Sequence, residues 1–149
     1  MKKSKICSIL LVASALVLAF SSCKKDKDPS KNEILTTGKW KVISSSISPA
    51  TDWDGDGDLD NDLYGLLDAC EKDNYTIFRT DGTLEENQGP GKCDPLDPQT
   101  DILTWSLKNN DTILVVDGED YTIEQLDETT LRLKLSDLGL TFTSTLRKF

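Results

Sequence analysis

From Gly38 to the end of the chain, apolar residues recur with the period of two that is typical of β-strands. The clearest case is residues 102–108, where Leu103, Trp105 and Leu107 alternate with polar side chains. This pattern predicts eight strands, which are Lys39–Ile47, Tyr75–Arg79, Thr83–Asn87, Ile102–Lys108, Thr112–Val116, Tyr121–Leu126, Thr130–Ser136 and Leu140–Lys148.

Short turn sequences separate most of these strands, and Asp81-Gly82 is a strong hairpin signal because both residues tolerate positive φ. Such a chain folds as an antiparallel meander, and closure into a barrel removes the exposed edges. The long connection after the first strand contains apolar residues at helical spacing in Leu63–Cys70. The pattern predicts an all-β protein, an eight-stranded antiparallel up-and-down barrel with one short helix.

The N-terminal residues 1–22 have the pattern of a secretory signal peptide, with lysines before an apolar run at residues 6–20. That run is shorter than the roughly 20 residues that a membrane-spanning helix needs. The stretch Ala19-Phe20-Ser21-Ser22-Cys23 resembles a bacterial lipobox, in which the cysteine is acylated. We expect Cys23 to carry the lipid, residues 23–37 to form anchor and tether, and the protein to sit at the outer membrane, facing the periplasm or the cell surface. Ordinary signal cleavage, with Cys23 free or in a disulfide, is the alternative.

The chain has four cysteines and no histidine. Cys7 leaves with the predicted signal peptide and Cys23 takes the lipid, so Cys70 and Cys93 remain in an oxidising compartment. Neither lies in a Cys-x-x-Cys motif, and no histidine completes a zinc site. We expect a structural disulfide between Cys70 and Cys93 rather than a metal or redox site.

The formal charge of −9 opposes nucleic-acid binding, which requires a basic surface. Without histidine the chain also lacks the commonest general base and the partner of a serine or cysteine nucleophile. Carboxylate pairs such as Glu85 and Glu86 lie at predicted turns or strand ends, where solubilising charge is the simpler interpretation than a hydrolase site. We therefore do not expect an enzyme.

An aspartate-rich stretch between the first strand and the helix fits part of the EF-hand calcium loop. The candidate ligands are Asp52, Asp54, Asp56, Asp58, Asp60 and Asp62. Gly57 falls at the position of the sharp turn, but Leu63 stands where a bidentate glutamate belongs, and no helix precedes the loop. Two interpretations stay open, a weak Ca²⁺ site as a possible cofactor site and a solvated acidic loop.

Several short motifs together resemble a family of small bacterial lipocalin-like lipoproteins. They are the lipobox, the Gly-x-Trp sequence Gly38-Lys39-Trp40, Asp54-Gly55-Asp56-Gly57, Ala69-Cys70-Glu71-Lys72-Asp73, Phe78 with Asp81-Gly82-Thr83, Cys93-Asp94-Pro95 and Trp105-Ser106-Leu107. The resemblance runs from Gly38 to about Leu146 and implies an eight-stranded barrel over residues 38–149 with an unassigned ligand. It also implies an arginine packed on the Trp40 indole from the last strand, for which Arg147 is the candidate.

The residues expected in the barrel core or a ligand pocket are Trp40, Val42, Leu103, Trp105, Leu107, Tyr121, Leu133 and Phe142. An eight-stranded barrel can be filled by side chains or can hold one small ligand, and both outcomes stay open here. Our main hypothesis is a lipid-anchored, non-enzymatic protein that binds a small apolar or amphipathic molecule. The alternative is a Ca²⁺-stabilised surface module with a filled barrel that contacts protein or glycan through its loops.

Overall fold

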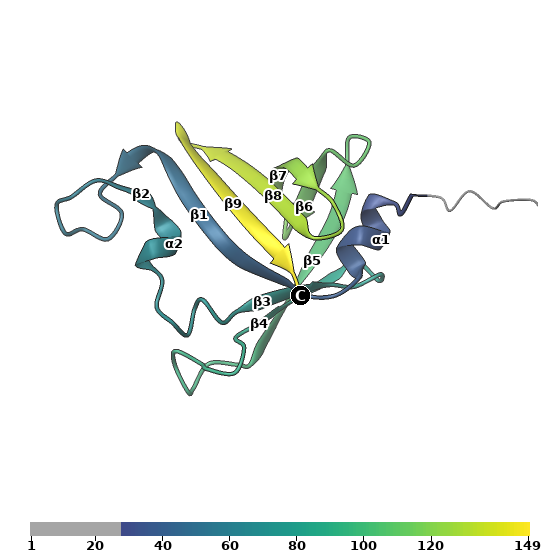
Figure 1. Ribbon diagram of the computed structural model, residues 1–149, viewed down its shortest axis with the longest axis horizontal. Coiled ribbons are helices and arrows are strands. Elements are labelled where there is room, and N and C mark those ends of the chain that lie inside the picture. The colour runs from purple at the N-terminus through teal and green to yellow at the C-terminus, as the bar shows by residue number, and fades with distance from the viewer. Residues whose placement is uncertain (1–27) are drawn as a thin grey trace, which may run out of the picture.

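The computed structural model describes residues 28–149, and eight antiparallel strands in it close into a barrel (Figure 1). The barrel strands are β1 (Trp40–Thr51), β3 (Tyr75–Phe78), β4 (Thr83–Asn87), β5 (Thr100–Lys108), β6 (Ile113–Val116), β7 (Glu119–Leu126), β8 (Thr130–Asp137) and β9 (Leu140–Lys148). Neighbours in sequence pair in order, and β1 closes the circuit by pairing with both β9 and β3. A further short strand, β2 (Asp60–Asp62), pairs only with the far part of β1. The predicted barrel is confirmed.

A β-bulge at Ile43 changes which residues of β1 face the interior. Val42 pairs with Leu146, and the next pair joins Ser44 to Thr145, so Ile43 is the extra residue. Trp40 and Val42 face inward before the bulge, and the inward positions after it are Ser45 and Ile47. The bulge therefore turns Ser45 and Ile47 inward, where strict alternation from Trp40 would have placed Ser44 and Ser46.

The packed core occupies one part of the barrel and contains two buried indoles. Its buried members are Leu35, Trp40, Phe78, Leu84, Trp105, Leu114, Leu131 and Leu146. The Trp40 Nε1 donates to the Leu35 carbonyl at 2.9 Å, and the Trp105 Nε1 donates to the Arg79 carbonyl at 2.9 Å. Both indole N–H groups are thus satisfied, which removes the main cost of burying them.

Helix α1 (Lys31–Thr36) lies within the segment that the sequence assigned to the tether. It begins with a capping box, in which the Ser30 side chain accepts from the Glu33 backbone and the Glu33 side chain from the Ser30 backbone. Its Leu35 is fully buried against Trp40 in the core cluster. The packed part of the chain therefore begins before Gly38, and residues 28–149 contain two short helices rather than the one predicted. The signal peptide and Cys23 lie outside the described residues.

The second helix, α2 (Leu63–Leu66), is shorter than the predicted Leu63–Cys70. It begins at Asp62, whose side chain accepts from the Gly65 backbone N–H at 3.0 Å, and Leu67 is already extended. Leu66 is exposed, so the helix has no buried face that would stabilise further turns. No helix in residues 28–149 is long and apolar enough to cross a membrane.

Lys148, not Arg147, packs on the Trp40 indole. The Lys148 Nζ lies 4.8 Å from the ring centroid and donates to the Ile34 carbonyl at 2.7 Å. Arg147 is exposed on the outer face of β9, because it follows the inward-facing Leu146 and the strand continues without a bulge. The prediction that Arg147 packs on the Trp40 indole was therefore wrong, because alternate residues of a strand point to opposite faces of the sheet.

Candidate functional site

Beside the packed core the barrel has a cavity of about 340 Å³ that opens to solvent, here called the lumen. Its lining residues are Val42, Ser45, Thr76, Phe78, Leu84, Glu86, Leu114, Val116, Tyr121, Leu133, Leu135, Phe142, Ser144 and Leu146. Most of these side chains are apolar, and the volume falls within the roughly 300–1,000 Å³ range of small-molecule sites. The interior is therefore only partly filled by its own side chains.

A few polar groups occupy defined places on this apolar wall. The Ser45 and Ser144 hydroxyls lie 3.2 Å apart across β1 and β9. The Tyr121 hydroxyl donates to the Glu119 carboxylate at 2.9 Å, and burial, with that hydrogen bond, raises the pKa of Tyr121 to about 12. The pKa of Glu86 is raised, first by desolvation and then by the nearby Asp101 charge. The lumen is thus an apolar cavity with hydroxyls and one carboxylate on its wall.

A second cavity of about 450 Å³, here called the antechamber, adjoins the lumen. Val42, Thr76 and Glu86 line both cavities, so the two meet along this row of side chains. The remaining lining residues are Trp40, Asp68, Glu71, Asn74, Tyr75, Asn87, Gln88, Cys93, Asp97 and Asp101. This lining is rich in carboxylate and amide oxygens, in contrast to that of the lumen.

The antechamber wall is held by the Cys70–Cys93 disulfide, which confirms the predicted pairing. The bridge joins the connection after α2 to the connection between β4 and β5, with Cα atoms 5.3 Å apart. The same two connections touch at Gly89, where a Cβ would lie 2.5 Å from the Asp73 carbonyl oxygen. Only glycine fits this approach at its φ of +64°.

The predicted core or pocket residues divide between two roles. Val42, Tyr121, Leu133 and Phe142 line the lumen. Trp40 and Trp105 belong to the packed core, and Leu103 and Leu107 pack against that core.

Sequence reasoning missed Glu86, which it grouped with Glu85 as surface charge. Glu85 does face outward, where it pairs with Arg79. Glu86 has the same strand parity as the buried Leu84, and this parity was the signal that could have placed it on the cavity-facing side of β4, where its side chain remains exposed.

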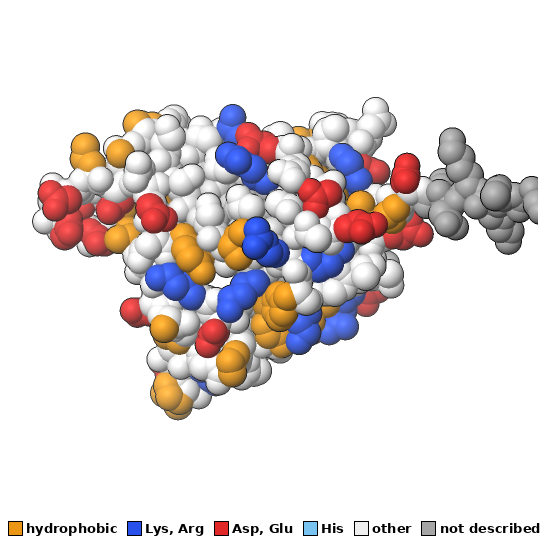
Figure 2. All heavy atoms as spheres, in the orientation of Figure 1, with side chains coloured by type: hydrophobic (Ala, Val, Ile, Leu, Met, Phe, Trp, Pro, Cys, Tyr) orange, Lys and Arg blue, Asp and Glu red, His pale blue; other side chains and the backbone are white. Residues whose placement is uncertain are grey.

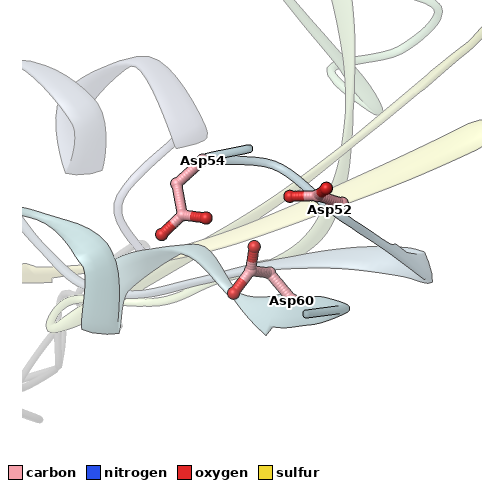
Figure 3. A group of neighbouring side chains, drawn as sticks. All are labelled: Asp52, Asp54 and Asp60. Atoms are coloured by element: carbon pink, nitrogen blue, oxygen red, sulfur yellow. The ribbon is translucent and has the colours of Figure 1, made fainter. Parts of the chain in front are cut away.

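The aspartate loop returns on itself because β2 pairs with β1, and Thr51 stands opposite Asp60. Carboxylate oxygens of Asp52, Asp54 and Asp60 consequently lie within 4.8 Å of one another (Figure 3). Each accepts a backbone N–H through one oxygen, so the other oxygen of each is available. Oxygen ligands of this kind suit Ca²⁺.

The other three predicted ligands do not join this cluster. Asp56 and Asp58 are exposed, and one Asp56 oxygen accepts from the Asp58 backbone at 2.8 Å. Asp62 caps α2 instead. The structure thus gathers three of the six predicted ligands, because the hairpin of β1 and β2 sets the path of the loop, and Ca²⁺ binding stays a prediction. Figure 2 shows acidic side chains gathered at the end of the molecule where this loop lies.

The aspartate loop also contacts the lumen wall. The Trp53 ring meets the Phe142 ring edge-on, with centroids 5.6 Å apart, and Phe142 lines the lumen. Trp53 remains half exposed. The loop is therefore packed against the barrel interior at one point, through an aromatic pair.

This chain resembles known proteins at the level of a family model and of one solved structure. Among solved structures, the chain is similar to Japanin from Rhipicephalus appendiculatus, solved bound to cholesterol, with 14% identity and a TM-score of 0.49 over 81% of this chain and 80% of that one. No curated protein matches the chain. Residues 36–133, from the end of α1 into β8, match the family model described as the lipocalin-like domain. The chain belongs to the lipocalin-like domain family.

Proposed function

We propose that this chain is a non-enzymatic binding protein that holds a small apolar or amphipathic molecule in the lumen. The observation that carries the proposal is the apolar cavity of about 340 Å³ beside an otherwise packed barrel core. Burial of apolar ligand surface there contributes roughly 25 cal/mol per Å² before the cost of association. The hydroxyls and the carboxylate on the wall offer partners to the polar end of an amphipathic ligand.

We further propose that the protein works at the outer membrane, held by an acyl chain on Cys23. This part rests on the lipobox sequence. The chain between Cys23 and the Ser30 cap of α1 is short and charged, so it suits a tether. More than one acyl chain is needed for stable anchoring, as in lipoproteins of this kind.

A matched pair of neighbouring variants on β6 tests ligand binding. Val116 lines the lumen, whereas Val115 has the opposite strand parity and is absent from the lining. Val116→Phe fills part of the cavity, so it should weaken binding of the apolar fluorescent probe N-phenylnaphthylamine by about tenfold. Val115→Phe should leave probe binding unchanged. Equal binding by both variants, each with a cooperative thermal melt, would contradict a ligand site in the lumen.

The alternative of a Ca²⁺-stabilised surface module keeps one supporting observation, the cluster of Asp52, Asp54 and Asp60. These carboxylates fit a hard cation, and Ca²⁺ binding there stays a prediction. The filled barrel that the alternative required does not agree with the lumen. We therefore retain the cation as a stabilising addition to the binding protein.

A further inference from the structure

We propose that the molecule bound in the lumen is an uncharged amphiphile with a hydroxyl head group, and that Ser45 and Ser144 bind this hydroxyl. The inference rests on the proposed function and deepens it, because it names the head group of the ligand and the side chains that recognise it. It accounts for a pair of hydroxyls on an otherwise apolar stretch of the barrel wall.

The strand register isolates this hydroxyl pair between two apolar pairs. Along the inner face of β1 and β9 the opposed residues are Val42–Leu146, Ser45–Ser144 and Ile47–Phe142. The bulge at Ile43 decides this order, because strict alternation would have turned Ser44 and Ser46 inward instead of Ser45 and Ile47. The inner face of β1 beyond the bulge therefore presents one serine and one isoleucine to the interior, where the unbulged strand would present two serines.

The two hydroxyls use only part of their hydrogen-bonding capacity. Each can donate one hydrogen bond and accept two. Their oxygens lie 3.2 Å apart, so one hydroxyl donates to the other, and within residues 28–149 neither makes a further hydrogen bond. One donor hydrogen and several lone pairs are thus left at the wall of the lumen, which both residues line. A ligand hydroxyl, which donates and accepts at one atom, matches this pair.

The charges around the lumen oppose an ionic head group. No lysine or arginine of the described residues lines either the lumen or the antechamber. A ligand carboxylate would therefore lose hydration without gaining a counter-charge, which is costly. An ammonium group gains little more, because Glu86, the carboxylate on the lumen wall, is exposed and screened by solvent. An uncharged hydroxyl avoids both costs.

Competitors of equal chain length test this assignment, namely decanol, decanoate and decylamine at neutral pH. Decanol should displace N-phenylnaphthylamine from the parent protein at the lowest concentration of the three. In the variant Ser45→Ala/Ser144→Ala, the decanol concentration needed should rise about fivefold, the effect of one hydrogen bond of average strength. Binding of N-phenylnaphthylamine, which has no hydroxyl, should be unchanged in that variant.

The matched control is Ser44→Ala/Thr145→Val, which removes two hydroxyls from the neighbouring opposed pair, outside the lumen lining. It should bind decanol as the parent does. An equal loss of decanol binding in this control would assign the effect to the strands in general and overturn the proposed hydroxyl site.

Unchanged decanol binding in Ser45→Ala/Ser144→Ala would overturn the site, as would tighter binding of decanoate or decylamine by the parent. Should the double variant lose its cooperative melt, Ser144→Ala alone takes its place, and unchanged decanol binding there has the same meaning. These results leave the proposed function intact, because the probe still occupies the lumen. A parent protein that binds neither the probe nor decanol overturns both.

Discussion

At the scale of single residues, one carboxylate on the inner face of the barrel has an effect on stability that depends on pH. Desolvation, then the Asp101 charge, raises the pKa of Glu86 above its ordinary value of 4.5. The folded protein therefore binds the Glu86 proton more tightly than the unfolded chain does. Ionised Glu86 destabilises the fold at neutral and higher pH, and this penalty is relieved as the pH falls through the raised pKa.

Glu86→Gln should stabilise the protein at pH 8 by a few tenths of a kcal/mol, because like charges opposite each other in a sheet are unfavourable and solvent screens this exposed pair. The gain should vanish below the unfolded pKa of 4.5, where Glu86 is protonated in both states. Urea unfolding at pH 8 and at a pH below 4.5 measures the difference in free energy of unfolding between the variant and the parent. The neighbouring Glu85→Gln is the control and should destabilise at pH 8, because the Arg79 hydrogen bond lowers the pKa of Glu85. A variant Glu86→Gln that is no more stable than the parent at pH 8 would refute the argument.

At the scale of elements, the hairpin of β1 and β2 selects three aspartates out of six. Sequence spacing alone ranked all six by an EF-hand pattern, in which a helix precedes the loop, whereas here strand β1 precedes it. Strand pairing instead brings Asp60 back beside Asp52, and the intervening turn adds Asp54. The two aspartates at the tip, Asp56 and Asp58, remain exposed.

Calcium should raise the melting temperature of the protein through this cluster. With a Kd on the order of 10⁻⁴ to 10⁻³ M, Ca²⁺ at ten times the Kd adds about 1.4 kcal/mol, or several degrees. Mg²⁺ at equal ionic strength should do much less, since it dehydrates reluctantly. Asp54→Asn/Asp60→Asn should abolish the shift, and the matched pair Asp56→Asn/Asp58→Asn should keep most of it. An equal shift with Mg²⁺ would mean charge screening of an acidic protein.

At the scale of the whole molecule, helix α1 connects the N-terminal part of the chain to the packed core of the barrel. Helix α1 buries Leu35 against Trp40, and Lys31 of the same helix donates to the Asp111 carbonyl at 2.8 Å. Figure 1 shows α1 at one end of the view and the loop between β1 and β2 at the other. Helix α1 is therefore packed as part of the barrel domain.

Cys23→Ser should release the protein from membranes, because the variant has no thiol at the lipobox position to acylate. Fractionation of cells that express the full chain measures this, with Cys7→Ser as the control that should remain in the membrane fraction. A Cys23→Ser protein that still fractionates with membranes would mean that lipidation does not attach it.

The sequence by itself determined the eight barrel strands, their meander order and, by elimination among the four cysteines, the disulfide. Alternation, as in Leu103, Trp105 and Leu107, and Asp-Gly turns act between near neighbours, so a single chain reveals them. The tertiary structure decided the bulge at Ile43, the choice of Lys148 over Arg147 and the size of the lumen. The bulge and the Lys148 contact depend on which residues meet across strands that are far apart in sequence, and the lumen depends on how completely side chains fill the closed barrel. A local sequence pattern contains no information about either.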